Sequence, residues 1–435
     1  MTQLWQRGAR ALYALLLRGA MPLYLLRLWR RGAAEPIYRQ ALPERFGRYQ
    51  GPAPAPGMLW LHAVSLGETR AAQPLIEALR TQQPGLRLLL THGTATGRTA
   101  GQSLLREGDA QAWLPYDTPG AARRFLRRFQ PSVGVLMETE LWPSLMREAE
   151  RAGLPIVLAN ARLSERSARK GRRLAALLHP AARRLTLALA QTAGDAERLR
   201  AAGAPQVLID GNLKFDVTPP PPLLARGRQW RDAAQRPVVM AANSREGEEA
   251  SLLAAWRSQP APRPLLLLVP RHPQRFDEVA AMVAAHGFSL ARRSAWADVP
   301  PATAAAADVW LGDSMGEMAL YYAMAEVALL GGSFEPLGGH NLIEAAACGC
   351  PIVIGLHTFN FAQASEQALA AGAALRAADM ATAVVAAVCL ASDAGRADRA
   401  DRAQRALAFA AAHRGAAQQM ARRILALATP PHTRA

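Results

Sequence analysis

The sequence predicts an α/β protein with two similar halves, and three observations lead to this prediction. From residue 58 onward, short apolar runs typical of buried parallel strands alternate with helical stretches. A proline-rich stretch at 216–236 interrupts the alternation, which then resumes. The length of 435 residues fits two or three domains. We therefore expect two Rossmann-like domains that face a cleft, with ligands at the carboxyl ends of the strands.

Residues 1–50 are expected to form a membrane-anchor segment. They contain nine Arg against two acids, and two apolar runs, Ala11–Leu17 and Gly19–Leu26, that Arg18 separates. A membrane-spanning helix needs about 20 apolar residues, and both runs are shorter. We expect this segment to lie in the membrane interface, with Arg side chains on lipid phosphates. An ordinary N-terminal helix packed on the core is the alternative.

The first domain is expected over residues 51–215. Its apolar runs predict strands at Met58–His62, Leu86–Thr91, Val133–Met137, Ile156–Ala159, Thr186–Ala190 and Val207–Ile209. Helical patterns occur between them at Thr69–Thr81, Ala121–Phe129 and Leu141–Arg151.

The connector at 216–236 contains four consecutive prolines, from Pro219 to Pro222, which are expected to exclude both helix and central strand. The second domain is expected over residues 237–435. Its predicted strands are Val238–Ala241, Leu265–Val269, Val309–Leu311, Val327–Leu330 and Pro351–Ile354.

The charge and cysteine content limit the classes of partner. The chain carries 51 basic and 34 acidic residues, a net charge of +17, which suits anionic partners such as phosphates or an acidic membrane. All but two of the basic residues are Arg, a bias that makes Arg abundance weak support for nucleic acid, and no nucleic-acid partner is expected. Three Cys form neither a disulfide framework nor a zinc-ligand spacing.

Three carboxylates follow predicted strands of the first domain. Glu68 comes after the first strand at a helix start, where it is either a general base or a residue that stabilises the helix dipole. Glu138 and Glu140 directly follow a buried strand, where burying carboxylates is costly without partners, so a functional role is favoured. Lys214 is one of only two lysines and suits a site too narrow for a guanidinium group.

Strand ends of the second domain carry candidate anion-binding residues. Ser244 could hold an anion with the first-turn amides of the next helix, or merely cap that helix. Arg271 and His272 follow another strand and are placed at the cleft. Gly316 and Glu317 are expected to open a helix.

The glycine-rich stretch before Asn341 lets backbone amides approach a phosphate. Glu344, one turn into the following helix, could accept both hydroxyls of a ribose. His340 and Glu344 have the i, i+4 spacing of metal ligands, but no third ligand is evident and no metal site is predicted.

Taken together and in this order, the motifs resemble those of the 3-deoxy-D-manno-octulosonic acid (Kdo) transferases of Gram-negative bacteria. The matching motifs run over nearly the whole chain: His62–Glu68, Met137–Pro143, Asn160–Ser164, Leu213–Asp216, Glu246–Glu249, Pro270–Pro273, Gly338–Asn341 and His357–Phe361. The resemblance implies a GT-B fold and an inverting glycosyltransferase that moves Kdo from CMP-Kdo to a lipid A precursor (lipid IVA) in lipopolysaccharide core biosynthesis. It also implies a membrane-associated N-terminus at the cytoplasmic face of the inner membrane, with neither metal nor cofactor.

The resemblance also implies roles for individual residues. Glu68 would deprotonate the acceptor hydroxyl, and Glu138 and Lys214 would stabilise the transition state. The CMP site would consist of Pro270, Arg271, Met315, Gly316, Glu317, Asn341, Leu342, Ile343 and Glu344.

Two departures from the family pattern occur in the second domain. Leu342-Ile343 replaces the usual Pro-Leu, and because both pairs are apolar the backbone contacts should survive. Ser244-Arg245 replaces the usual Thr-His, which puts any role of that histidine in doubt.

Two other functions are alternatives to the transferase. A nucleotide-sugar 2-epimerase of the same fold would need no membrane anchor, so the N-terminal segment disfavours it. A non-enzymatic basic protein bound to a membrane would leave the acids at the strand ends unexplained.

Overall fold

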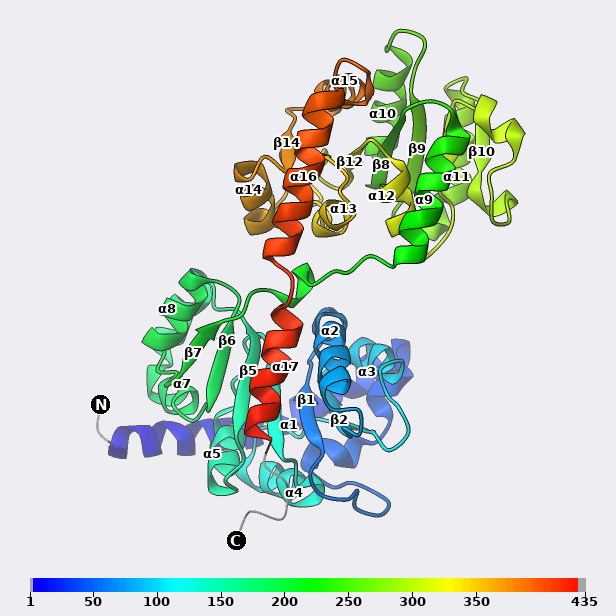
Figure 1. Cartoon of the computed structure of the whole chain (residues 1–435). Coiled ribbons are helices and arrows are strands. Elements are labelled where there is room, and N and C mark those ends of the chain that lie inside the picture. The colour runs from blue at the N-terminus through cyan, green and yellow to red at the C-terminus, as the bar shows by residue number, and fades with distance from the viewer. Residues whose placement is uncertain (1–2, 429–435) are drawn as a thin grey trace. The chain divides into compact units, whose positions relative to one another are not determined.

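The computed structural model describes residues 3–428, so the outer ends of the first and last predicted segments lie outside the described residues. The chain divides into two compact units (Figure 1). The first extends to Asp216 and includes the segment from Gly415 onward, and the second covers Val217–Arg414. Each unit is described separately.

The first unit contains a seven-stranded parallel sheet with the strand order β3-β2-β1-β4-β5-β6-β7. Its strands are β1 (Leu59–His62), β2 (Leu88–His92), β3 (Ala110–Trp113), β4 (Val133–Met137), β5 (Ile156–Ala161), β6 (Leu187–Ala190) and β7 (Val207–Ile209). The order reverses between β1 and β4, where Leu59 pairs with Val133. In open parallel sheets, ligands bind beside the carboxyl ends of the strands at such a reversal.

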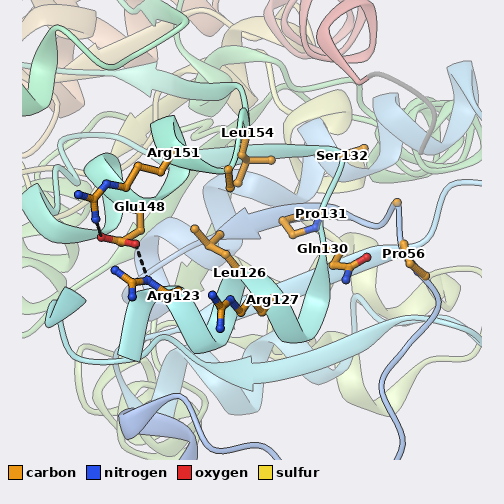
Figure 2. Close-up of a pocket in the computed structure, with 12 residues that line it drawn as sticks. Pro56, Arg123, Leu126, Arg127, Gln130, Pro131, Ser132, Glu148, Arg151 and Leu154 are labelled. Carbon is orange, nitrogen blue, oxygen red and sulfur yellow. Dashed lines mark hydrogen bonds and ion pairs between the residues drawn. The ribbon is translucent and has the colours of Figure 1, made fainter. Parts of the chain in front are cut away.

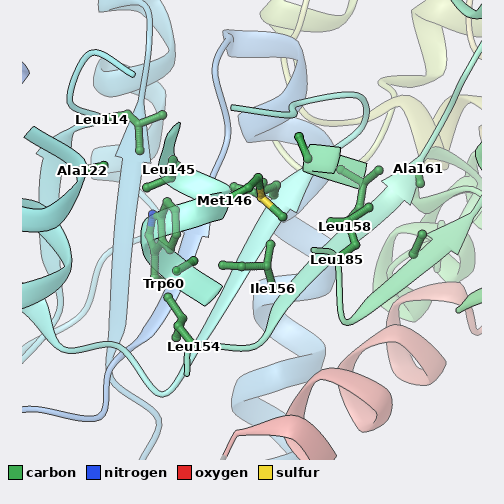
Figure 3. Close-up of a cluster of buried hydrophobic side chains, with 14 of the residues drawn as sticks. Trp60, Leu114, Ala122, Leu145, Met146, Leu154, Ile156, Leu158, Ala161 and Leu185 are labelled. Atoms are coloured by element: carbon green, nitrogen blue, oxygen red, sulfur yellow. The ribbon is translucent and has the colours of Figure 1, made fainter. Parts of the chain in front are cut away.

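Helices cover both faces of this sheet. They are α1 (Gln3–Ala34), α2 (Leu66–Gln82), α3 (Ala95–Gln102), α4 (Pro119–Phe129), α5 (Pro143–Arg151), α6 (Glu165–Arg173), α7 (Ala175–Ala182), α8 (Ala193–Ala201) and α17 (Ala416–Leu427), with short 3₁₀ turns η1 (Pro36–Arg39), η2 (Leu42–Phe46) and η3 (Leu213–Phe215). One apolar cluster, centred on Trp60, Met146 and Ile156, fills the face under α4 and α5 (Figure 3). A second lies on the other face, where α17 packs beside α2 (Figure 1).

The second unit repeats the plan, with the strand order β10-β11-β9-β8-β12-β13-β14 and parallel pairing throughout. Its strands are β8 (Val238–Ser244), β9 (Leu265–Pro270), β10 (Leu290–Arg292), β11 (Val309–Leu311), β12 (Val327–Leu330), β13 (Ile352–Ile354) and β14 (Ala374–Arg376). The reversal falls between β8 and β12.

The helices of the second unit include several short ones. They are α9 (Pro221–Ala234), α10 (Glu248–Arg257), α11 (Phe276–Ala285), α12 (Met318–Met324), α13 (Ile343–Ala347), α14 (Ala362–Ala370), α15 (Met380–Ala391) and α16 (Arg396–Ala412), with 3₁₀ turns η4 (Pro273–Arg275), η5 (Arg293–Ala295) and η6 (Ala302–Ala306).

The structure confirms the predicted parallel α/β architecture and all eleven predicted strands, with boundaries that differ by at most three residues. Three strands were not predicted, β3, β10 and β14. Each has only three or four residues, and β10 and β14 end on an arginine, so none forms an apolar run.

The exclusion of helix from the proline-rich connector was wrong. Helix α9 begins at Pro221 and continues into what was predicted to be connector. Proline is tolerated in the first turn of a helix, because the N–H groups there have no partner inside the helix. The C-terminal segment also differs from the prediction, since α17 belongs to the first unit rather than the second.

Helix α1 is one continuous helix, although Arg18 and Pro22 lie inside it. Each of the two apolar runs was expected to be too short for a membrane span, but both belong to this single helix. By length and composition, Gly8–Ala34 is long and apolar enough to cross a membrane.

One face of α1 rests on the first unit and the opposite face is open. The Tyr13 hydroxyl donates to Asp117 Oδ2 at 3.0 Å, and Leu28 is buried with Tyr38. These two contacts lie about 22 Å apart along the helix, at 1.5 Å per residue. The other face exposes Leu12, Leu15, Leu16, Leu23 and Leu26, which fall within an arc of about 100° at 100° per residue.

Candidate active site

Glu68 lies in the first turn of α2, directly after β1. Its carboxylate accepts hydrogen bonds from Val64 N at 2.8 Å and from the Ser65 hydroxyl at 3.2 Å. Ser65 in turn caps the helix by accepting from Glu68 N. This is a capping-box arrangement, so the stabilising role considered for Glu68 is present in the structure. The same contacts fix the carboxylate in one orientation.

Glu138 and Asn160 end neighbouring strands in the left-handed backbone region, with φ of +59° and +50°. This conformation is uncommon outside glycine, and such residues cluster at functional sites. Glu138 N donates to Ala159 O at 3.0 Å, and Glu138 O accepts from Arg162 N at 3.3 Å. These bonds tie the end of β4 to β5 and fix Glu138 at the carboxyl edge of the sheet.

The buried side chain of Asn160 positions the turn that carries Lys214. Its Oδ1 accepts from Leu213 N at 3.1 Å, next to the exposed Lys214. Asp216 anchors the other end of this turn by accepting from Gly415 N and Ala417 N, at the start of α17. The last helix therefore helps to hold Lys214 in place.

The structure brings Glu68, Glu138, Glu140 and Lys214 together at the reversal point of the first sheet. Burial raises the pKa of Glu68, and the charge of Glu138 raises it further, while Val64, Ser65 and Lys214 oppose the shift. Burial also raises the pKa of Glu140, to about 7, with additional repulsion from Glu68 and Glu138. Glu140 was noticed in the sequence but given no catalytic role, because its proximity to Glu68 depends on the fold.

His62, in the same motif as Glu68, is fully buried. Its Nδ1 lies 2.9 Å from Thr91 Oγ1, on the neighbouring strand β2. Burial lowers the pKa of His62 to about 3, so the imidazole is neutral at physiological pH. The residue supports the pairing of β1 with β2 and carries no charge in the site.

In the second unit, positively charged groups gather at the carboxyl ends of β8 and β9. Burial lowers the pKa of His340 to about 4, and the nearby charges of Arg271, Arg245 and His272 lower it further. Arg271 is exposed and joined to the end of β8 by its backbone N, which donates to Ser244 O at 3.0 Å. This edge of the second sheet is therefore suited to an anion.

Ser244 does not cap the next helix, contrary to one of the two expectations. It belongs to β8 and donates to Glu249 Oε1 at 2.9 Å. Helix α10 begins instead after Gly247, and the buried carboxylate of Glu248 accepts from the backbone of Gly332 and Phe334. The acidic run after the strand therefore has a structural role.

The stretch Asn341–Glu344 opens helix α13, after Gly338 and Gly339, which have φ of +93° and +74°. Asn341 Oδ1 accepts from Ile343 N at 3.1 Å, and Leu342 and Ile343 are fully buried. Burial raises the pKa of Glu344, against the effect of Asn341 and of Arg271. The electrostatic effect of Arg271 places it near Glu344.

The stretch Met315–Glu317 leads into α12, with Met315 exposed and Gly316 at φ +81°. Glu317 accepts from Arg293 Nε at 2.9 Å and from Arg226 Nη2 at 2.8 Å. Burial raises the pKa of Glu317, but hydrogen bonds from Arg293 and Ser314 outweigh it and hold the pKa below its usual value. These two arginine partners are distant along the chain, so no sequence pattern indicated them.

Within residues 3–428, no group of three or more His, Cys, Asp or Glu side chains is arranged to hold a metal ion. The pair His340 and Glu344 therefore lacks a third ligand among the described residues.

A surface cavity of about 550 Å³ lies away from these groups (Figure 2). Its lining includes Pro56, Gln130 and Leu154, which precede β1, β4 and β5. It therefore opens at the amino ends of the strands, opposite the edge that carries Glu68. Arg123 and Arg151 in its wall both pair with Glu148 (Figure 2).

The chain is similar to known proteins over most of its length. Residues 40–217 match the family model described as 3-deoxy-D-manno-octulosonic-acid transferase (kdotransferase). The 3-deoxy-D-manno-octulosonic acid transferase of Bordetella pertussis is 49% identical over 423 residues, which cover 94% of this chain and 97% of that protein. The transferase of Haemophilus influenzae is 37% identical over 359 residues, covering 81% of this chain and 83% of that protein.

Among solved structures, the UDP-GlcNAc 2-epimerase from Neisseria meningitidis bound to UDP-GlcNAc aligns with a TM-score of 0.53. The sequences are 14% identical, and the alignment covers 85% of this chain and 99% of the epimerase. This likeness concerns the fold, two Rossmann-like units in one chain, as in the GT-B class. Because the identity to the Bordetella protein extends over nearly the whole length of both chains, the chain belongs to the family of Kdo transferases, glycosyltransferases of lipopolysaccharide biosynthesis.

Proposed function

We propose that this Kdo transferase takes Kdo from CMP-Kdo and transfers it, with inversion, to a lipid A precursor such as lipid IVA. The observation that carries the proposal is the cluster of Glu68, Glu138 and Lys214 at the reversal point of the first sheet. In this assignment the first unit binds the acceptor and the second unit binds the donor.

Glu68 is the proton acceptor in the proposed reaction. It removes the proton from an acceptor sugar hydroxyl, whose oxygen forms a bond to the anomeric carbon of Kdo while the bond from that carbon to the CMP phosphate breaks. The raised pKa of Glu68 makes it a better base than an exposed carboxylate. Its hydrogen bonds from Val64 and Ser65 hold it ready for this step.

Glu138 and Lys214 stabilise the charges that develop in the transition state. Departure of CMP leaves positive charge on the sugar ring, which a fixed carboxylate such as Glu138 favours. Lys214 provides a compact positive charge near Glu68.

The donor site uses the positive edge of the second unit. Arg271 and the backbone amides at Asn341–Glu344 would receive the CMP phosphate, and Glu344 would accept hydroxyls of the ribose. Pro270, Met315, Gly316 and Glu317 would complete the nucleotide site, with Glu317 held by its two arginines. Negative charge on the leaving CMP would be met by these groups without a metal ion.

Helix α1 places the protein on the anionic cytoplasmic face of the inner membrane in this proposal. Tyr13 and Leu28 both contact the first unit, so the helix lies along the protein. Its exposed leucines would then enter the membrane interface while the helix stays parallel to the surface. Arginines on the same helix would contact lipid phosphates.

The basic test of the proposal is a CMP-release assay in excess EDTA. We expect CMP to be released only when both CMP-Kdo and the lipid A precursor are present, and at the same rate with and without chelator. The second unit supplies positive side chains and amides for the leaving phosphate, so no metal is needed. Activity that chelation abolishes and added Mg²⁺ or Zn²⁺ restores would show this to be wrong.

Substitution Glu68→Gln should lower turnover by roughly 10²–10⁴, the usual effect of losing a general base. Glutamine can keep the capping contacts, so the fold should be unchanged. The affinity for CMP, measured by calorimetry, should stay within about twofold of the wild type. Turnover above a tenth of the wild-type value would exclude Glu68 as the base.

Substitution Glu140→Gln should stabilise the protein at alkaline pH. The pKa of Glu140 is raised from 4.5 to about 7 in the folded state, so folding becomes less favourable as pH rises between these two values. Removing the charge should then raise the free energy of unfolding by about 3 kcal/mol at pH 8 and by under about 1 kcal/mol at pH 5. Urea unfolding at both values measures this.

The matched control for Glu140 is Glu197→Gln, on an exposed position of α8. It should change the free energy of unfolding little at either pH. If Glu140→Gln and Glu197→Gln changed the free energy of unfolding equally, the charge of Glu140 would not destabilise the folded state.

Substitution of Leu16 and Leu23 by Ser should weaken binding to anionic vesicles at least tenfold. These side chains are 63% and 72% exposed, and burying a leucine in an apolar phase contributes about 2 kcal/mol. The fold should be unaffected, because neither side chain is buried. Vesicle co-sedimentation measures the binding, and Val385→Ser with Leu407→Ser in the second unit is the control. Binding that the α1 substitutions leave unchanged would contradict the anchor.

A further inference from the structure

Helix α6 (Glu165–Arg173) presents an exposed, strongly basic face. None of its residues is buried, and its nine residues include Arg166, Arg169, Lys170, Arg172 and Arg173. At 100° per residue, these five fall within an arc of about 160°, which also contains one acid, the exposed Glu165. Ala168 and Gly171, which are less exposed, lie outside this arc. We call these five side chains the α6 basic face.

The α6 basic face has no acidic partner within the described part of the chain. No carboxylate there lies within 4 Å of any of the five, although many other arginines are paired, such as Arg123 and Arg151 with Glu148. Like charges three or four residues apart destabilise a helix by about 0.2–0.5 kcal/mol per pair. Arg169 has three such neighbours, Arg166, Arg172 and Arg173, against one acid at the same spacing, Glu165. A surface that repels itself in this way is suited to a polyanionic partner.

The position of α6 relates this face to the candidate active site. The helix begins four residues after β5, and Ser164 caps it. Just before it, the backbone N of Arg162 donates to Glu138 O at 3.3 Å. Beyond it, α7 packs against the membrane helix α1. The chain therefore runs from the catalytic edge through the α6 basic face to a helix that contacts α1.

We propose that the α6 basic face binds the phosphate groups of the acceptor lipid. This inference rests on the proposed function, in which the acceptor is a phosphorylated disaccharide with acyl chains. Its sugar hydroxyl must reach Glu68 while its acyl chains stay in the bilayer beside α1. Arginine forks suit phosphate because they donate two parallel hydrogen bonds. We assign α6 to the acceptor rather than to the donor, because α6 belongs to the unit that carries Glu68 and that binds the acceptor in the proposed function.

The test measures acceptor binding in neutral detergent micelles, where no anionic bilayer is present. The variant Arg169→Gln with Arg173→Gln should raise the Kd for the phosphorylated acceptor roughly 10–100-fold, measured without donor. In the transfer assay, the acceptor KM should rise by a similar factor, while kcat and the KM for CMP-Kdo stay within about twofold. Arg169→Lys with Arg173→Lys should restore part of the affinity because the charge is kept.

A matched control is Arg106→Gln with Arg228→Gln, two exposed arginines outside α6, neither of whose side chains forms an ion pair with a carboxylate in the described chain. It should leave every value within about twofold. A dephosphorylated acceptor should bind the wild type as weakly as the intact acceptor binds the α6 variant, and the α6 substitutions should cost little further affinity.

The outcomes separate this proposal from the proposed function. An acceptor Kd that the α6 variant does not change overturns the proposal, including the case in which only binding to anionic vesicles falls. A wild type that binds the phosphorylated acceptor through α6 but does not transfer Kdo supports the proposal and overturns the function.

Discussion

The candidate site of the first unit depends on three carboxylates, those of Glu68, Glu138 and Glu140. They lie close together and partly buried at one edge of the sheet. Burial and mutual repulsion both disfavour the charged forms of Glu68 and Glu140, whose pKa values are raised. The surrounding structure supplies the compensation: a capping box for Glu68, a left-handed turn at Glu138, and Asn160 positioning the turn of Lys214. A protein selected only for stability would have no reason to keep this arrangement.

The two units carry different sets of charged groups at the corresponding edges of their sheets. The first gathers glutamates at its reversal point, which suits removal of a proton from a neutral hydroxyl. The second gathers Arg271, Arg245 and His272 around a neutral His340, which suits an anionic nucleotide. In the proposed function, the same strand order serves two different tasks, because function depends on the residues placed after each strand.

Elements that are buried on both faces were predicted well from the sequence. Short, partly buried strands and a helix that begins with proline were predicted poorly. Strands buried on both faces, such as Val133–Met137, stand out as apolar runs, whereas β10 (Leu290–Arg292) is short and only partly buried. The helix that begins at Pro221 was missed because four consecutive prolines were taken to exclude a helix, although the first turn of a helix accepts proline. The site motifs were found, but the coupling of Glu140 to Glu68 depends on strands that lie far apart in the sequence, so only the fold could reveal it.

The position of α1 adds a constraint on how a lipid acceptor reaches Glu68. A helix anchored to the folded unit at both Tyr13 and Leu28 cannot extend across a bilayer without giving up one of these contacts. Its length and composition permit a span, but the contacts favour a helix that lies flat, with its leucines in the acyl region. In the proposed function, a flat helix would keep the first unit against the membrane, so that the sugar of a lipid acceptor could reach the carboxylates while its acyl chains remain in the bilayer.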